Sequence, residues 1–149
     1  MTTQKYHKFK AKIFIDCSGD SVLAPISGAS FRIGREGKNE YGESIAPDVA
    51  DSKTMGLSCM LQAREYSEER QFIAPDFARK LTDKEFSNRP PNLQDEMENF
   101  WYLELGGIQN TIDDTEKLRD KLVSLAYGTW DYLKNSPKFA DENKNFDID

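Results

Sequence analysis

The chain has 149 residues, of which 38% are hydrophobic and 31% charged, and 20 Lys and Arg against 26 Asp and Glu give a formal net charge of −6. This composition fits one folded domain and excludes an aromatic-poor disordered chain, and the absence of a basic cluster with interleaved aromatic residues argues against a nucleic-acid partner. No apolar run approaches the roughly 18–20 residues that span a bilayer, and residues 1–5 lead into no signal-peptide core, so we expect a soluble chain without a targeting segment and with no compartment indicated.

The first predicted elements lie between residues 6 and 34. Residues 6–16 alternate in polarity and become continuously apolar at residues 13–15, which predicts a strand covered on both faces that breaks at Ser18. Because no partner strand precedes it, this strand indicates an internal portion of a larger fold. Residues 22–26 predict a short helix that stops near Gly28, and residues 29–34 predict a second strand.

The middle of the chain alternates short elements with polar loops. Residues 34–42 predict a loop and residues 55–63 a central strand. Short helical segments are expected at residues 75–81 and 82–85, before two prolines force an extended loop. Residues 100–105 predict an aromatic strand that ends at a pair of glycines.

The strongest pattern in the sequence is a long amphipathic helix between residues 115 and 133, where apolar residues recur at three- and four-residue steps and Trp130 is expected to pack. Thr111 and Asp114 resemble a capping box, Ser136 and a proline supply the stop, and residues 141–147 should fray. We therefore predict an α+β (mixed α/β) fold in one domain over residues 1–149, with short helices, this long helix and a sheet of about four strands.

Two cysteines and one histidine are the obvious candidates for metal or redox chemistry. Cys17 and Cys59 lie far apart without a Cys-x-x-Cys motif, and His7 completes no familiar zinc spacing with them. We expect no metal site, and we expect both cysteines to be small buried hydrophobic residues.

A tight turn with an acidic residue on either side follows the first predicted strand. Glycine lets a backbone approach a nucleotide closely, and a carboxylate can accept hydrogen bonds from sugar hydroxyls, so Asp16 and Asp20 could flank a nucleotide site. Both could equally be turn formers that bond their own backbone. A phosphoryl-accepting Asp16 is disfavoured, because Ser18 occupies the position of the second aspartate that such enzymes use.

Residues 11–20 resemble the strand and Ser-Gly-Asp turn of glutathione-reductase-like FAD enzymes, with Cys17 where alanine is usual. Later segments are similar to one bacterial branch, the FAD-dependent oxidoreductase family that is sometimes labelled putative xanthan lyase. These segments are residues 28–36, 40–43, 46–47, 53–56, 73–76, 101–107 and 127–131. Nothing in the sequence resembles a polysaccharide-cleaving site, so lyase activity is not expected.

The resemblance implies a flavin site with Ser18, Gly19 and Asp20 bordering the FAD. It makes Trp101, Tyr102 and Glu104 candidates to line the substrate side, although an equally simple reading has the two aromatic residues in core packing. In the family a Gly-x-Gly-x-x-Gly turn at a helix N-terminus holds most of the cofactor, and this motif does not occur in the 149 residues.

The resemblance therefore implies an internal, substrate-side portion of an FAD-dependent oxidoreductase acting on an unknown small molecule. Its expected partner is the remainder of the parent enzyme, and the chain alone should be inactive and should not retain FAD. A homodimer through the exposed edge of the strand at residues 13–16 is a further possibility. The alternative is a free-standing module that binds carbohydrate or protein through residues 100–102.

Overall fold

A computed structural model describes residues 6–94 and 100–148. The expectation about a targeting segment concerns residues 1–5, which lie outside this range. The chain divides between Ile33 and Gly34 into two compact units. We call the described residues 6–33 the N-terminal unit and the described residues from Gly34 onward the C-terminal unit, and each is described by itself.

The N-terminal unit contains one helix, α1 (Leu23–Ser27), in the part of the chain that the structure describes. It ends at Gly28, which adopts a left-handed conformation with φ of 78° and donates its N–H to the carbonyls of Ala24 and Pro25. The predicted short helix is confirmed. The predicted strands at residues 13–16 and 29–34 are wrong, because the unit provides no neighbouring strand to take their backbone hydrogen bonds.

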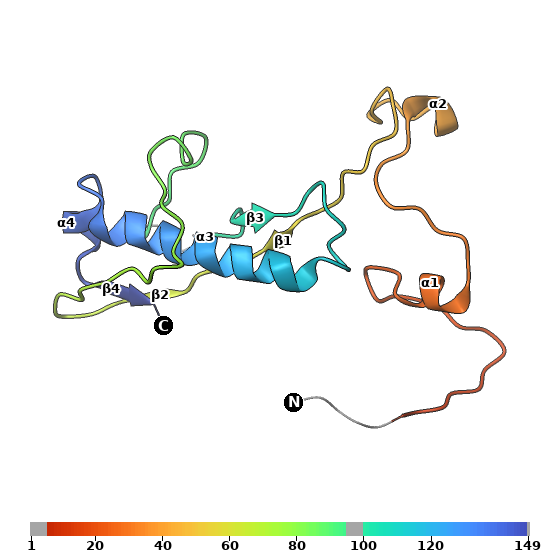
Figure 1. Cartoon of the computed structure of the whole chain (residues 1–149), viewed down its shortest axis with the longest axis horizontal. Helices are drawn as coiled ribbons and strands as arrows, with labels where there is room; N and C mark the ends of the chain where they lie inside the picture. Colours follow the sequence, from red (N-terminus) through yellow and green to blue (C-terminus); the bar gives the residue numbers. More distant parts are fainter. Residues whose placement is uncertain (1–5, 95–99, 149) are drawn as a thin grey trace. The chain divides into compact units, whose positions relative to one another are not determined.

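The C-terminal unit begins with a segment that runs out and back between Gly34 and Asp51 (Figure 1). Arg35 and Asp51 exchange backbone hydrogen bonds of 3.0 Å in each direction, and their side chains form an ion pair. Between them lies α2 (Lys38–Tyr41), so the predicted loop contains a helical turn. Gly34 has φ of 98°, and a Cβ there would lie 2.1 Å from the carbonyl oxygen of Asp51, so this close closure requires glycine.

The strands of the C-terminal unit form two antiparallel pairs. β1 (Leu57–Ser58) pairs with β3 (Glu104–Leu105), and β2 (Ala63–Glu65) pairs with β4 (Phe146–Ile148). The α+β class is confirmed, but the expected single sheet of about four strands is wrong. One cause is Phe100, whose φ of 56° interrupts extended backbone and leaves a turn where the aromatic strand was predicted to begin.

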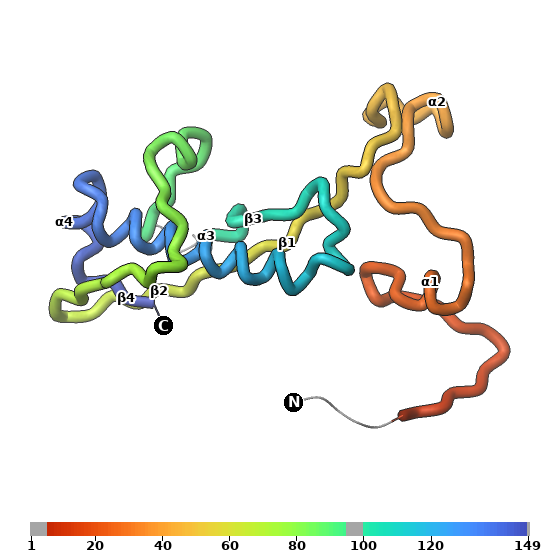
Figure 2. Tube along the Cα trace, viewed as in Figure 1, coloured from red at the N-terminus to blue at the C-terminus, as the bar shows by residue number. Residues whose placement is uncertain are grey.

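Residues 66–94 follow β2 along an irregular path (Figure 2). The short helices predicted at residues 75–81 and 82–85 are wrong, since the backbone forms single turns there. One turn closes with a 2.9 Å bond from the N–H of Ala78 to the carbonyl of Pro75, and another with a 3.1 Å bond from Glu85 to Thr82. Isolated helical turns of this length need tertiary support to grow, because helix nucleation is unfavourable.

The long helix α3 (Thr115–Asn135) organises the core of the C-terminal unit and lies alongside β1 and β3 (Figure 1). Its buried apolar face confirms the predicted helix, and Ser136 caps its end as expected. Trp130 is fully buried and packs in one cluster with Phe100 and other apolar residues. The buried hydrophobic side chains of this helix and cluster are Phe100, Leu103, Leu118, Leu122, Ala126, Trp130, Tyr132 and Leu133.

The start of α3 differs from the predicted capping box. Asp114 is the N-cap residue, but its side chain makes no capping hydrogen bond. Instead, the side-chain oxygen of Asn110 accepts the N–H groups of Ile112 and Asp113 at 3.1 and 3.2 Å. The turn before the helix is therefore held by asparagine, a residue that readily bonds the backbone two positions ahead.

The predicted fraying after α3 is also wrong, because α4 (Ala140–Asn143) and β4 follow. Lys134 explains why this segment is ordered. Its buried ammonium group donates to the carbonyls of Asn143, Lys144 and Phe146 at 2.8, 2.8 and 2.7 Å. Burial lowers the pKa of Lys134, but these three charge-assisted bonds fasten the polar C-terminal segment onto the helix.

Candidate functional site

The Ser-Gly-Asp turn of the N-terminal unit is held together by one carboxylate. Asp16 accepts the N–H and the hydroxyl of Ser18 at 2.9 and 2.6 Å, and it accepts the N–H of Leu23 at 2.8 Å. The hydrogen bonds from Ser18, then the one from Leu23, lower the pKa of Asp16. Asp16 is therefore a turn former, which is one of the two roles that its position predicts.

The hydroxyl of Ser18 also makes its hydrogen bonds within the turn. Its hydroxyl donates to Asp16 and accepts the N–H of Val22 at 2.9 Å, so it connects the turn to the start of α1. Gly19 adopts φ of 84°, and no atom lies within 4 Å of the point where a Cβ would stand. Gly19 and Asp20 thus form the open side of the turn, where a ligand could approach the backbone.

This open side fits one wall of a nucleotide site. Among the described residues, no acceptor takes the N–H of Gly19 or Asp20, and the carboxylate of Asp20 has no hydrogen-bond or ion-pair partner. A ribose hydroxyl could donate to such a carboxylate, and backbone N–H groups could receive a phosphate. The turn offers these groups from one side only, so it could contact FAD but could not enclose it.

The cysteines have no role that the structure supports. Cys17 is exposed in the turn and Cys59 is half-buried, so the expectation that both are buried is wrong for Cys17. Its side chain lies in the unit that lacks a core of its own. In the described ranges, no group of three or more His, Cys, Asp or Glu side chains could hold a metal ion.

A cavity of about 490 Å³ lies in the C-terminal unit, between residues 79–89, residues 101–104 and Leu125 of α3. Trp101, Tyr102 and Glu104 all line it, so the structure brings the three predicted substrate-side residues to one place. The volume is in the range of small-molecule sites, which run from roughly 300 to 1,000 Å³. Assignment of these residues to a substrate stays a prediction.

The two aromatic residues divide between packing and exposure. Tyr102 is half-buried and packs against the core cluster, which agrees with the alternative that the aromatic segment is structural. Trp101 remains 54% exposed, with its ring centroid 6.2 Å from that of Tyr102 in an edge-to-face arrangement. The indole of Trp101 is thus the aromatic surface that a ligand could contact.

Arg89 is the cavity residue that the sequence did not identify. Its guanidinium carbon lies 5.0 Å from the ring centroid of Trp101 and 5.0 Å from that of Tyr102. Both distances are within the range of a cation–π interaction. The contact joins a loop residue just before two prolines to residues beyond position 100, and no local pattern predicts such a pairing.

Both carboxylates in the cavity wall already accept hydrogen bonds from the protein. Glu85 accepts the N–H and the hydroxyl of Thr82 at 2.8 and 2.7 Å, and these bonds lower its pKa. Glu104 accepts the N–H of Gly56 at 3.1 Å, which fixes it against β1. The two carboxylates therefore have structural partners on the protein side.

The protein-family profile described as FAD dependent oxidoreductase matches residues 1–141. No curated protein and no solved structure shows significant similarity to the chain. Within the part of the chain that is described, no helix is long and apolar enough to cross a membrane.

Proposed function

The chain belongs to the FAD-dependent oxidoreductase family, and from this premise we propose that it is the internal, substrate-side portion of such an enzyme. The remainder of the enzyme would supply most of the flavin site. Two observations support this proposal. The 149 residues contain no Gly-x-Gly-x-x-Gly motif, and the turn at Gly19 and Asp20 offers ligand groups from one side only.

The observation that carries the proposal is the unburied apolar surface of the N-terminal unit. None of its described residues is buried, and the side chain of Phe14, for example, is 64% exposed. Covering one such side chain is worth roughly 1.5–3 kcal/mol, so a set of ten favours a covering partner. Its exposed large apolar residues are Tyr6, Phe9, Ile13, Phe14, Ile15, Val22, Leu23, Ile26, Phe31 and Ile33.

We infer that the cover is the dinucleotide-binding part of the enzyme, because the resemblance implies that the Ser-Gly-Asp turn of this unit adjoins that part. A second copy of this chain is the alternative cover. The structure of the single chain has no strand at residues 13–16, so a homodimer there would form its strand only on pairing. Size-exclusion chromatography with light scattering distinguishes the two covers, because a homodimer persists when the chain is purified alone.

In the assembled enzyme, Gly19 and Asp20 would contact the cofactor. Asp20 would accept a ribose hydroxyl, and the N–H groups of the turn would face the nucleotide, while Asp16 and Ser18 keep the turn in shape. When bound, the flavin supplies the acceptor for hydride or electrons. Trp101, Tyr102 and Glu104 would line the place of the small substrate, in the cavity described above.

The experiment that tests this proposal is flavin retention by the full chain. The chain is incubated with excess FAD and desalted, and bound flavin is measured by visible absorbance against protein concentration. We expect no stoichiometric retention by the chain alone, and retention after co-expression with the dinucleotide-binding part of its parent enzyme. Asp20→Asn should weaken that retention, with Asp48→Asn as the matched control. Stoichiometric FAD on the isolated chain would contradict the proposal.

A further inference from the structure

The cavity between residues 79–89 and residues 101–104 has a chemical character that points to a class of ligand. We propose that it binds a carboxylate attached to a flat apolar face, with Arg89 receiving the carboxylate and Trp101 contacting the face. The inference rests on the proposed function only where it calls this ligand the substrate. Binding itself requires no flavin and can be measured on the chain as it is.

Arg89 is held by aromatic rings and by no carboxylate. Its guanidinium lies over Trp101 and Tyr102, and among the described residues no carboxylate forms an ion pair with it. A guanidinium held by two rings keeps its edge available, and that edge matches a carboxylate through two parallel hydrogen bonds. The aromatic contacts would therefore orient Arg89 before a ligand arrives.

The second step is a further cation in the same wall. Arg79 lines the cavity, and its backbone N–H is bonded to the carbonyl of Ser124 at 3.0 Å, so its main chain is fixed against α3. Its guanidinium, like that of Arg89, has no ion-pair partner among the residues that the structure describes. Two unpaired guanidinium groups beside one cavity favour an anion there.

The third step concerns the acidic groups that would oppose an anion. Glu85 is bonded to Thr82, and Glu104 is bonded to Gly56, so a hydrogen bond from the protein stabilises each negative charge. Neither of them pairs with an arginine in the described ranges. The wall thus carries two arginines and two glutamates, and the difference between them is that the protein supplies hydrogen-bond donors to both carboxylates but, among the described residues, no acceptor to either guanidinium.

The fourth step is the shape of the ligand. Leu81, Phe86, Leu103 and Leu125 give the cavity an apolar lining, and the half-exposed indole of Trp101 adds a flat surface at its edge. Aromatic rings contact flat groups over a large area. An aryl carboxylate joins its charge to a flat ring, and a sugar acid joins it to a pyranose whose C–H face can lie on an indole, so the two share this chemistry.

The test is calorimetric titration of the full chain with two acids and their neutral counterparts. Benzoate and D-glucuronate represent the two sources, and benzamide and D-glucose match them in shape without the charge. We expect at least one acid to bind and its neutral counterpart to bind at least about tenfold more weakly, as the loss of a charged hydrogen bond implies. Preference for benzoate indicates an aryl acid, and preference for glucuronate indicates a sugar acid.

The variants separate the role of Arg89 from a general effect of charge. Arg89→Gln should weaken binding of the acid about tenfold or more, whereas Arg119→Gln on the exposed face of α3 should leave it unchanged. Trp101→Leu should weaken both acid and neutral compound. Circular dichroism confirms that each variant is folded.

Three results would overturn the inference: no binding of either acid, equal binding of acid and neutral compound, or unchanged binding by Arg89→Gln. Each leaves the flavin-retention experiment unaffected, so a failure here is distinguishable from a failure of the proposed function.

Discussion

The N-terminal and C-terminal units use similar apolar residues with different results. Residues 13–15 form one of the most apolar runs in the chain, yet all three side chains are exposed. In the C-terminal unit, apolar residues at helical spacing along α3 bury Trp130 and Leu133 completely. An apolar run becomes a core only where a second element of the same unit covers it.

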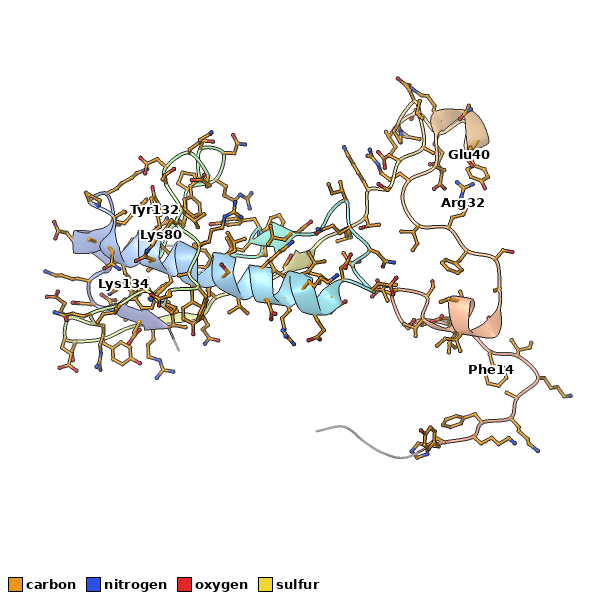
Figure 3. All side chains as sticks on the ribbon, in the orientation of Figure 1. Phe14, Arg32, Glu40, Lys80, Tyr132 and Lys134 are labelled. Atoms are coloured by element: carbon orange, nitrogen blue, oxygen red, sulfur yellow. The ribbon has the colours of Figure 1, made fainter. Side chains whose placement is uncertain are left out.

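The same contrast is visible in single side chains (Figure 3). Phe14 extends from an irregular backbone segment of the N-terminal unit, whereas Tyr132 and Lys134 lie on the C-terminal half of α3. The N-terminal unit should therefore tolerate the loss of an apolar side chain far better than the C-terminal unit.

The largest effect is expected from Trp130→Ala. Removing this fully buried ring should lower the free energy of unfolding by about 3–5 kcal/mol. Phe14→Ala, in the N-terminal unit, should change it by less than about 0.5 kcal/mol. Urea unfolding followed by far-UV circular dichroism measures both, and equal losses would break the contrast between the units.

A smaller effect is expected where α3 contacts the loop at residues 75–81. A Cβ at Gly128 would lie 2.1 Å from the carbonyl oxygen of Arg79, so Gly128→Ala must move the backbone. We expect a loss of about 1–3 kcal/mol, as for other overpacked sites. Gly107→Ala is the matched control, since its Cβ would meet the nearest atom at an ordinary 3.6 Å. Thermal unfolding compares the two variants. Equal transition temperatures would contradict the close approach of Gly128 to Arg79.

Tyr132 should make the stability of the C-terminal unit depend on alkaline pH. Burial, together with the hydrogen bond to Asp83, raises the pKa of Tyr132 from 10.0 to about 12. Above pH 10 the unfolded chain loses this proton first, so the stabilising contribution is complete below pH 10 and is lost as pH rises through about 12.

Urea unfolding at several alkaline pH values checks this expectation. Tyr132→Phe should unfold with a shallower dependence on pH and should lose about 1 kcal/mol at neutral pH with the hydrogen bond. Tyr41→Phe, at an exposed position, is the control. If stability depended on pH equally steeply in Tyr132→Phe and in the unmodified chain, the pKa of the Tyr132 phenol would not differ between the folded and unfolded states.

The smallest effect concerns an exposed ion pair. The hydrogen bond from Arg35, followed by the N–H of Lys53, lowers the pKa of Asp51 from 3.8 to about 2. The depressed value means that this stabilisation is present above pH 3.8 and is lost as pH falls through about 2. Arg35→Gln should return the midpoint toward 3.8 in an NMR titration of the Asp51 carboxyl, whereas Lys38→Gln should not. A midpoint unmoved by Arg35→Gln contradicts the pairing.

The parts of the fold that the sequence predicts are those that local forces determine. The periodicity of α3 and the glycine stop of α1 are each set by residues that lie only a few positions apart in the sequence. Both predictions are confirmed. The β2–β4 pair joins segments about eighty residues apart, and it depends on the buried amine of Lys134. Such long-range pairing has no signal in a single polar segment.

The candidate site divides in the same way. The residue pattern predicted a tight turn, and the resemblance assigned Ser18, Gly19 and Asp20 to the cofactor. Only the structure shows that the Ser18 hydroxyl already bonds within the turn and that Gly19 and Asp20 are open. Resemblance selected Trp101, Tyr102 and Glu104, and the cavity gathers them. Arg89 could not be predicted, because its two aromatic contacts depend on how distant loops meet.

No described residue of the N-terminal unit is buried, and we propose that the rest of an FAD-dependent oxidoreductase covers this unit. Amide hydrogen exchange of the full chain, followed by mass spectrometry, tests this claim most directly. We predict strong protection across α3, near-intrinsic exchange across residues 6–33, and no change in those residues when FAD is added. Strong protection of residues 6–33 in the chain alone, increased by FAD, would contradict the account.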